Sequence, residues 1–233
     1  MKKVVLAYSG GLDTTFCALH LSKDLGYEVH AVLINTGGFS PEELNETETR
    51  ANSLGISSFT ILDVTKTYYQ EVIKFLVFGN VLKNQTYPLS VSAERILQAK
   101  TLAEYAKKIG AKCVAHGSTG AGNDQVRFDM IFQTIVPDIE IITPIRDLKL
   151  SREAEIEYLK EHGVSMNFEK AAYSINKGIW GTSVGGKETL TSSQTLPEAA
   201  WPTPATKTNS EEISLTFEKG ELIGVNDKKY ENS

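Results

Sequence analysis

The sequence predicts an α/β fold in which helices cover both faces of a doubly wound, mainly parallel β-sheet, followed by part of a second, α+β domain. Three observations support this prediction. Short apolar, β-branched runs alternate with segments of helical periodicity, as strands alternate with crossover helices in parallel sheets. The first run, residues 4–7, is apolar throughout, which is typical of a strand covered on both faces. After about residue 164 the sequence pattern changes to one that predicts turns and short strands.

The first part of the chain contains the predicted sheet. Its expected strands are residues 4–7, 29–35, 58–64, 112–116 and 139–143. A helix is expected to begin at Asp13, directly after the first strand, because Cys17, Leu21 and Leu25 follow at intervals of four and so form one buried stripe.

The helix after the second strand has the clearest boundary signals. Ser40 is a predicted N-cap, Pro41 takes the first helical position, and Glu43 is placed to complete a capping box. Two further helices are expected over residues 96–110 and 151–163, each ending at a glycine.

The last part of the chain predicts a different kind of structure. Residues 181–210 are dense in Ser, Thr, Gly and Pro, whereas residues 213–226 predict two strands joined at Lys219-Gly220. A hairpin alone is marginal in water, so we expect a domain that has been cut short. The expected units are residues 1–164 and an incomplete second domain, residues 165–233.

The composition predicts a soluble, cytoplasmic protein with a substantial core. The chain has 233 residues, of which 41% are hydrophobic, and a formal net charge of −5. This acidity argues against nucleic acid as a partner. Cys17 and Cys113 fall in a predicted helix and a predicted strand, so we expect buried thiols rather than a disulfide. No apolar run is long enough for a membrane span or a signal peptide, so no membrane partner is expected.

The first strand leads into a predicted phosphate site. A strand, a glycine turn and a helix start place free backbone N–H groups and the positive end of a helix dipole at one point. Gly10 and Gly11 permit backbone angles and close approaches that other residues resist. The turn reads S-G-G-L-D-T-T, which matches neither the Walker pattern nor the dinucleotide fingerprint. A plain turn is the alternative interpretation.

A second glycine-rich stretch, "HGSTGAGNDQVRFD" at residues 116–129, also follows a predicted strand. The simpler interpretation is a surface loop before a helix, with Asn123 or Asp124 as its N-cap. It leaves unexplained the density of polar groups at the carboxyl end of one strand, where ligands bind in open α/β sheets. These polar residues are Thr119, Asn123, Asp124, Gln125 and Arg127.

The first turn resembles the pyrophosphate loop of the N-type ATP pyrophosphatases, which adenylate a substrate and release pyrophosphate. Together, "LAYSGGLDTT", "YPLSVSAERILQAK" and "HGSTGAGNDQVRFD" resemble the argininosuccinate synthase family in order and spacing. The resemblance extends from about Lys2 to the end of the chain. It implies an adenine nucleotide α-hydrolase-like, Rossmann-like fold and a carbon–nitrogen ligase of arginine biosynthesis, which joins citrulline to aspartate at the expense of ATP. It also implies a homotetramer for the full-length family.

The resemblance assigns roles to residues of this sequence. The implied ATP-binding residues are Ala7, Tyr8, Ser9, Gly10, Gly11, Leu12, Asp13, Thr14, Thr15, Thr36 and Gly117, with Mg²⁺ carried on the phosphates. Citrulline would bind Tyr87, Ser92, Asn123, Arg127, Ser174 and Ser183, and aspartate would bind Thr119, Asn123 and Asp124. In the implied mechanism, the ureido oxygen of citrulline attacks the α-phosphorus of ATP. The amine of aspartate then attacks the resulting citrullyl-adenylate. This mechanism needs positioning and no side-chain nucleophile, so neither a catalytic residue nor a metal ligand is expected.

Simpler roles remain open for individual residues. Arg127 could be a solvated helix arginine, Tyr87 a packed aromatic with a satisfied hydroxyl, and Ser174 and Ser183 solvated serines. His116, next to the second loop, is expected to be packed or hydrogen-bonded rather than a general base.

The chain also departs from the family pattern. Thr36 stands where a small apolar residue is expected, Ala121 stands where many relatives have a lysine, and "SINKGIW" lacks an expected acidic pair. Because the chain also ends before the rest of the substrate-binding domain, we expect nucleotide binding ahead of turnover. The alternative functions are another adenylating enzyme, which thiolates tRNA or forms an amide, and a non-catalytic nucleotide-binding module.

Overall fold

The computed structural model describes residues 1–233 apart from 121, 167, 169–172, 204 and 231–233. The departure at Ala121 therefore lies outside the described residues. The first half of the chain forms a five-stranded sheet in the order β3-β2-β1-β4-β5, and every pairing in it is parallel. Its strands are β1 (Lys3–Ala7), β2 (Glu28–Asn35), β3 (Ser58–Asp63), β4 (Cys113–Ala115) and β5 (Glu140–Ile142). The predicted fold class and all five expected strands are confirmed.

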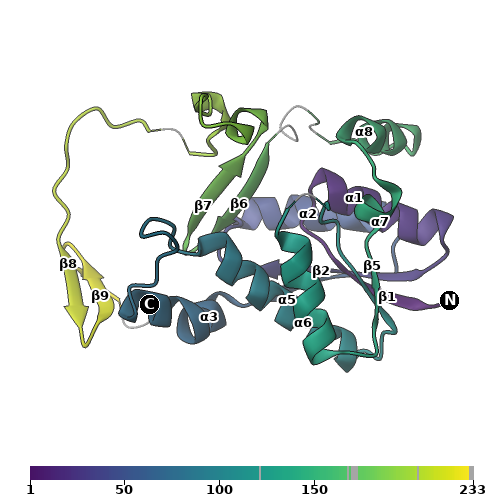
Figure 1. The fold of residues 1–233 in the computed structure, drawn as a ribbon, viewed down its shortest axis with the longest axis horizontal. Helices are drawn as coiled ribbons and strands as arrows, with labels where there is room; N and C mark the ends of the chain where they lie inside the picture. Colours follow the sequence, from purple (N-terminus) through teal and green to yellow (C-terminus); the bar gives the residue numbers. More distant parts are fainter. Residues whose placement is uncertain (121, 167, 169–172, 204, 231–233) are drawn as a thin grey trace.

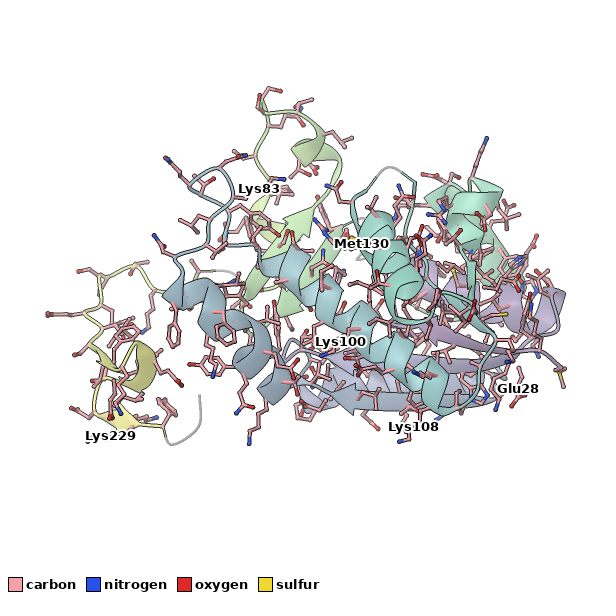
Figure 2. All side chains as sticks on the ribbon, turned by 60° about the horizontal axis from the view of Figure 1, so that its bottom comes forward. Glu28, Lys83, Lys100, Lys108, Met130 and Lys229 are labelled. Atoms are coloured by element: carbon pink, nitrogen blue, oxygen red, sulfur yellow. The ribbon has the colours of Figure 1, made fainter. Side chains whose placement is uncertain are left out.

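Helices cover both faces of this sheet, because successive side chains of a strand point to opposite sides. Val4 and Leu6 lie in the core under α1, α2, α7 and α8, whereas Val5 lies in a second core under α5 and α6. Figure 2 shows α5 and α6 side by side, marked by Lys100 and Met130. The helices are α1 (Leu12–Leu19), α2 (Pro41–Ser53), α5 (Ser90–Lys108), α6 (Asp124–Ile135), α7 (Pro144–Leu148) and α8 (Arg152–Glu161).

Several helical segments differ from the expectation. α5 begins at Ser90 instead of near residue 96, and α7 was not predicted. The first helix changes to a π-helical turn, η1 (His20–Asp24), instead of continuing as a regular α-helix. Between β3 and α5 the chain forms a run that the sequence analysis did not predict: α3 (Thr65–Tyr68), η2 (Tyr69–Ile73) and α4 (Lys74–Phe78). Tyr68 and Ile73 of this run are buried in a small third core with Leu97 of α5.

The predicted helix boundaries at serines are confirmed. Ser40 Oγ accepts a hydrogen bond from the backbone N–H of Glu43 at 3.2 Å, and Glu43 Oε2 accepts one from the backbone N–H of Ser40 at 2.7 Å. This is the expected capping box of α2. Ser151 caps α8 by accepting from the N–H of Ala154 at 3.3 Å.

The two cysteines agree with the prediction. Both Cys17 and Cys113 are free and buried. Burial also raises the pKa of the Cys17 thiol well above its ordinary value, so it stays protonated in the core. Across the described part of the chain, we find no helix with the length and apolarity that crossing a membrane requires.

The region after α8 consists of two small antiparallel sheets. The expected strand pair is confirmed as β8 (Leu215–Glu218) and β9 (Glu221–Val225), with a short β10 (Lys228–Lys229) added beside β9. Lys219 and Gly220 both have positive φ, 51° and 88°, as a tight hairpin turn requires. Figure 1 places this sheet beyond α3, at the end of the molecule opposite to the N-terminus. The other sheet is a hairpin of β6 (Ser174–Gly178) and β7 (Gly181–Gly185), which was not predicted from the sequence.

The tip of the β6–β7 hairpin packs against the loop that follows β2. The N–H of Ile179 donates to the carbonyl oxygen of Thr36 at 3.0 Å. A Cβ atom on Gly38 would overlap the carbonyl oxygen of Lys177, so the two backbones are in direct contact there. The indole N–H of Trp180 donates to the carbonyl oxygen of Pro88 at 2.7 Å. The hairpin therefore connects the end of β2 to the start of α5.

Replacing Ser40 with alanine tests the capping box. We expect Ser40→Ala to lower the free energy of unfolding by about 1 kcal/mol, because the N–H of Glu43 loses its acceptor. Urea denaturation followed by circular dichroism measures the change. Ser57→Ala is the matched control, because Ser57 is exposed and its hydroxyl has no hydrogen-bond partner among the described residues. Equal losses in the two variants would contradict a stabilising role for the box.

Candidate functional site

The two glycine-rich loops lie against each other at one edge of the sheet. They follow β1 and β4, which are neighbours, and the chain then passes to opposite faces of the sheet through α1 and α6. A Cβ atom on Gly117 would lie only 3.3 Å from the backbone carbon of Asp13 and 3.3 Å from its Cβ. The sequence prediction that these loops share one site is therefore supported by direct contact. Such a crossover point is the usual ligand site of an open α/β sheet.

The first loop combines a glycine of positive φ with a helix start that has no side-chain cap. Within the loop, the N–H groups of Ser9 and Gly11 donate to Thr14 Oγ1 at 3.3 Å and to Ser9 Oγ at 3.4 Å. Gly10 has φ +75°, a conformation that favours glycine, and a Cβ there would lie 2.8 Å from Thr47 Cγ2. Its carbonyl oxygen accepts a hydrogen bond from Arg50 Nη1 of α2 at 2.5 Å. Gly11 is the N-cap of α1 and supplies no side-chain cap. The first turn of α1 is therefore available to an anion.

The side chains of this loop divide into two groups. Ser9 is exposed and Thr14 is half-buried, and their hydroxyls lie 3.3 Å apart. The side chains of Tyr8, Leu12 and Thr15 are buried in the core, so these three residues can reach a ligand only through the main chain. Nine of the predicted ATP-binding residues, 7–15, thus form one continuous segment that offers hydroxyls and backbone to a ligand, whereas Thr36 and Gly117 lie on other loops.

Glu155 of α8 lies beneath this loop and was missed by the sequence analysis. It is only 2% exposed, and its Oε2 has no hydrogen-bond partner within the described residues. Burial and then the adjacent Asp13 carboxylate raise the pKa of Glu155 to about 8. Its spacing of four from the buried Leu159 is the signal that could have revealed an acid on the core face of the helix.

The second loop is held by a chain of hydrogen bonds that starts at His116. His116 is 1% exposed; its Nδ1 accepts from the N–H of Ser118 at 3.2 Å, so its Nε2 carries the hydrogen donated to Asp129 at 2.9 Å. Arg146 Nη1 bonds Asp129 at 2.8 Å and Gln125 at 3.0 Å. The prediction that His116 is packed and hydrogen-bonded is confirmed. Its hydrogen bond, followed by that of Arg146, keeps the pKa of Asp129 below the usual range.

The start of α6 tests two interpretations. Asn123 takes the N-cap position, as one of the two expected residues, but its side chain makes no capping hydrogen bond. The carboxylate of Asp124 is bonded by Arg127 Nη1 at 2.6 Å and Arg95 Nε at 3.1 Å. Arg127 is therefore not a solvated surface arginine. Its Nη2 also donates to Ser92 Oγ at 3.1 Å, which joins α6 to α5.

Tyr87 stands next to this pair. Its hydroxyl accepts hydrogen bonds from the backbone N–H groups of Val91 at 3.0 Å and Ser92 at 3.2 Å, and so it caps the first turn of α5. The hydroxyl of Tyr87 therefore has hydrogen-bond partners within the protein, as expected for a packed aromatic residue. It also lies beside Ser92 and Arg127. Thr119 and Asn123 are exposed on the neighbouring loop. These residues, which the resemblance assigns to citrulline and aspartate, lie at or near the starts of α5 and α6.

Thr36 is tied to a buried acid that sequence reasoning did not identify. Its side chain is buried, and its hydroxyl donates to Glu94 Oε1 at 2.5 Å. Burial raises the pKa of Glu94. Gln98 Nε2 donates to the same oxygen at 3.1 Å. The polar side chain at position 36 therefore has a local partner on α5.

Ser174 and Ser183 lie on the β6–β7 hairpin. The register pairs Ser174 with Gly185 and Gly178 with Gly181, so both serines share the hairpin face that carries these glycines. At the tip, a Cβ on Gly178 would lie 3.3 Å from both Thr36 Oγ1 and Glu94 Oε1. Ser174 is exposed and Ser183 is half-buried. Within the described residues, neither hydroxyl is bonded to another site residue.

The described residues contain no group of three or more His, Cys, Asp and Glu side chains that could hold a metal ion.

Comparisons with known proteins identify similar chains. A family model described as "Arginosuccinate synthase N-terminal HUP domain" matches residues 3–165. An argininosuccinate synthase of Sulfolobus acidocaldarius is 38% identical over 230 residues, which cover 98% of this chain and 58% of that protein. An argininosuccinate synthase of Methanocaldococcus jannaschii is also 38% identical, over 97% of this chain and 58% of that protein. The chain thus spans less than two thirds of the length of these relatives.

A solved structure, a predicted subunit of tRNA methyltransferase from Methanocaldococcus jannaschii, aligns with a TM-score of 0.45 and 18% identity, covering 69% of this chain and 75% of that chain.

The buried Glu155 predicts a pH-dependent stability. Because the pKa of Glu155 is raised, the folded state favours the neutral carboxyl group. Glu155 therefore contributes to the free energy of unfolding at low pH, and this contribution is lost as the pH rises from 4.5 to about 8. Glu155→Gln cannot ionise, and we expect it to remove this loss, by up to about 1.4 kcal/mol per pH unit. Urea unfolding at several pH values within this interval measures the slope.

Glu157→Gln is the matched control, because Glu157 is on the same helix but exposed. Parallel stability profiles for the wild type and Glu155→Gln would contradict the assignment.

Proposed function

Because this chain belongs to the argininosuccinate synthase family, we propose that it supplies the ATP-binding part of a ligase that joins citrulline to aspartate. The reaction would consume ATP and release AMP, pyrophosphate and argininosuccinate. The observation that carries the proposal is the contact between Gly117 and Asp13, because it brings a phosphate-type loop and a loop rich in amino-acid-binding groups to one place. The chain covers 58% of the length of its relatives, so the full activity belongs to the proposal.

We assign the phosphate portion of ATP to the first loop. The N–H groups at the start of α1 and the hydroxyls of Ser9 and Thr14 are suited to a leaving pyrophosphate, which gathers negative charge as it departs. Mg²⁺ would arrive on the phosphates as part of the substrate and neutralise charge. An acid such as Asp13 is favourable beside phosphates only if its carboxylate meets that cation. The main chain of Thr36 and Gly117 would complete the nucleotide site.

We assign the two amino acids to the second loop and α5. The planar fork of Arg127, beside Tyr87 and Ser92, suits the carboxylate of citrulline. Asp124 suits the ammonium group of aspartate, with Thr119 and Asn123 exposed next to it. The face of the β6–β7 hairpin that carries Ser174 and Ser183 would approach citrulline from the other side.

The chemistry would then depend on positioning. The ureido oxygen of citrulline attacks the α-phosphorus and pyrophosphate leaves; the amine of aspartate then attacks the adenylated carbon and AMP leaves. Holding the two reactants in line can lower a barrier by about 7–11 kcal/mol in well-oriented systems. His116 would maintain the loop rather than transfer a proton, because both of its ring nitrogens are already engaged.

We further propose that residues 1–164 are the ATP-binding unit and that residues 165–233 begin the substrate-binding domain. The parallel sheet and its helices end with α8, whereas the following strands form separate antiparallel sheets. A cytoplasmic location would suit two buried, unpaired thiols. The homotetramer expected for the full-length family also belongs to this proposal.

The nucleotide product tests the reaction. The chain is incubated with ATP, Mg²⁺ and citrulline, aspartate or both, and the products are separated. We expect AMP and pyrophosphate only when citrulline is present, because adenylation precedes ligation. ADP as the product would contradict the proposal, as would AMP formation that is independent of citrulline.

Binding of ATP tests the site separately from turnover. By calorimetry in Mg²⁺, we expect Asp13→Ala to weaken ATP binding by about tenfold, because the cation loses a carboxylate partner; without Mg²⁺ the loss should disappear. Asp138→Ala, which changes an exposed aspartate in the turn before β5, should leave both affinities unchanged. An equal loss with and without Mg²⁺ would contradict the role given to Asp13.

A further inference from the structure

The carboxylate of Asp124 is held by arginines from two different helices. Arg127, one turn further along α6, donates from Nη1 to Oδ1 at 2.6 Å. Arg95 of α5 donates from Nε to Oδ2 at 3.1 Å. Each carboxylate oxygen therefore has its own guanidinium partner. Nothing in the sequence analysis or in the family resemblance gave Arg95 a role.

The same contacts occupy Arg127. Its Nη1 is bonded to Asp124 and its Nη2 to Ser92 Oγ, at 2.6 Å and 3.1 Å. A substrate carboxylate that binds the fork of Arg127 must therefore take the place of the Asp124 carboxylate. Exchange of one carboxylate for another keeps the guanidinium paired, which avoids the cost of leaving a partly buried charge alone.

Arg95 and Arg127 each have a second partner besides Asp124, and that of Arg95 belongs to a longer row of hydrogen bonds. Arg95 Nη1 donates to Gln98 Oε1 at 2.7 Å, and Gln98 Nε2 donates to Glu94 Oε1 at 3.1 Å. The hydroxyl of Thr36 bonds the same oxygen of Glu94 at 2.5 Å. This row of bonds along α5 holds the guanidinium of Arg95 in place. Asp124 would consequently keep one arginine when it loses the other.

We propose that Arg95 is a positioning residue for Asp124, and that carboxylate exchange at Arg127 couples the two amino-acid sites. When the carboxylate of citrulline binds Arg127, Asp124 stays on Arg95 and its Oδ1 becomes free. That oxygen then accepts the ammonium group of aspartate. This inference rests on the proposed function, because that proposal supplies both substrates.

The coupling has a measurable consequence. Citrulline should tighten the binding of aspartate, and by thermodynamic reciprocity aspartate should tighten the binding of citrulline by the same factor. Without Arg95, Asp124 would have no anchor after the exchange, so this coupling should vanish while citrulline keeps its own site on Arg127. A residue with a merely structural role would change both affinities together.

Three variants separate these outcomes. Arg95→Gln removes the charge, Arg95→Lys keeps the charge but not the fork, and Lys100→Gln is the matched control. Lys100 is on the same helix and labelled in Figure 2, and it pairs with Glu71 at 3.0 Å rather than with the site. If Arg95→Gln does not fold, Arg95→Lys carries the test, and we expect partial coupling from it.

Aspartate is titrated into the full chain with and without saturating citrulline, followed by ¹⁵N NMR, which also detects weak binding. In the wild type and Lys100→Gln, we expect citrulline to tighten aspartate binding by about tenfold. In Arg95→Gln, we expect no tightening and citrulline binding within about threefold of the wild type. In the wild type, citrulline should shift the guanidinium signals of Arg127 and leave the Nε–H signal of Arg95 in place.

The outcomes distinguish the two proposals. If the wild type binds citrulline but shows no coupling, or if the Arg95 variants keep the full coupling, the inference is overturned and the proposed function stands. A parallel loss of citrulline and aspartate binding in both Arg95 variants would also overturn it, since Arg95 would then be structural. If the wild type binds neither amino acid, the proposed function is overturned and the inference is overturned with it.

Discussion

The structure depends on the close approach of the two loops that follow β1 and β4. The register pairs Val5 with Val114 and Leu6 with Ala115, so the two strands end level with each other. All four side chains are fully buried, which prevents the strands from sliding without exposing the core. Gly117 can then lie against Asp13 because it has no side chain. A Cβ atom at this position would press on Asp13, 3.3 Å away.

Several polar groups around this contact already have partners within the protein, although Glu155 Oε2 has none among the described residues. Arg50 bonds the carbonyl oxygen of Gly10, His116 bonds Asp129, and Asp124 bonds its two arginines. Partly buried charges and dipoles are costly when unpaired, so such a site is stable in the free protein only if its groups find internal partners. Binding at this edge of the sheet is therefore an exchange of partners as well as an addition of contacts.

Local sequence patterns predicted the helices and strands that are stabilised by residues close together in the sequence. The capping box at Ser40 lies within four residues, and the buried strands are continuous apolar runs. The β6–β7 hairpin was missed because its anchors are remote: Trp180 bonds the carbonyl oxygen of Pro88, and Ile179 bonds that of Thr36. The segment α3–η2–α4 was missed in the same way, since Tyr68 and Ile73 are buried against Leu97 of a later helix.

The candidate site shows the same limit. Both glycine loops could be predicted from the sequence, because each is defined by a short run of consecutive residues. Arg95 and Glu94 could not, because a single charged residue in a helix does not show in sequence whether it faces solvent or the core. Glu155 was missed although its spacing from Leu159 indicates the core face of α8. Asp124 was one of two residues expected to cap α6, but its carboxylate is taken by an arginine twenty-nine residues earlier in the chain. Competition between partners is decided by the tertiary fold.

The backbone contact between Gly38 and Lys177 limits which substitutions position 38 can accept. Any side chain at position 38 would collide with a peptide group of the β6–β7 hairpin, so the later segment dictates which amino acid the earlier codon can specify. A natural variant with a larger residue there would need a compensating rearrangement about 140 positions downstream. The amino acids that these two stretches can accept therefore depend on each other.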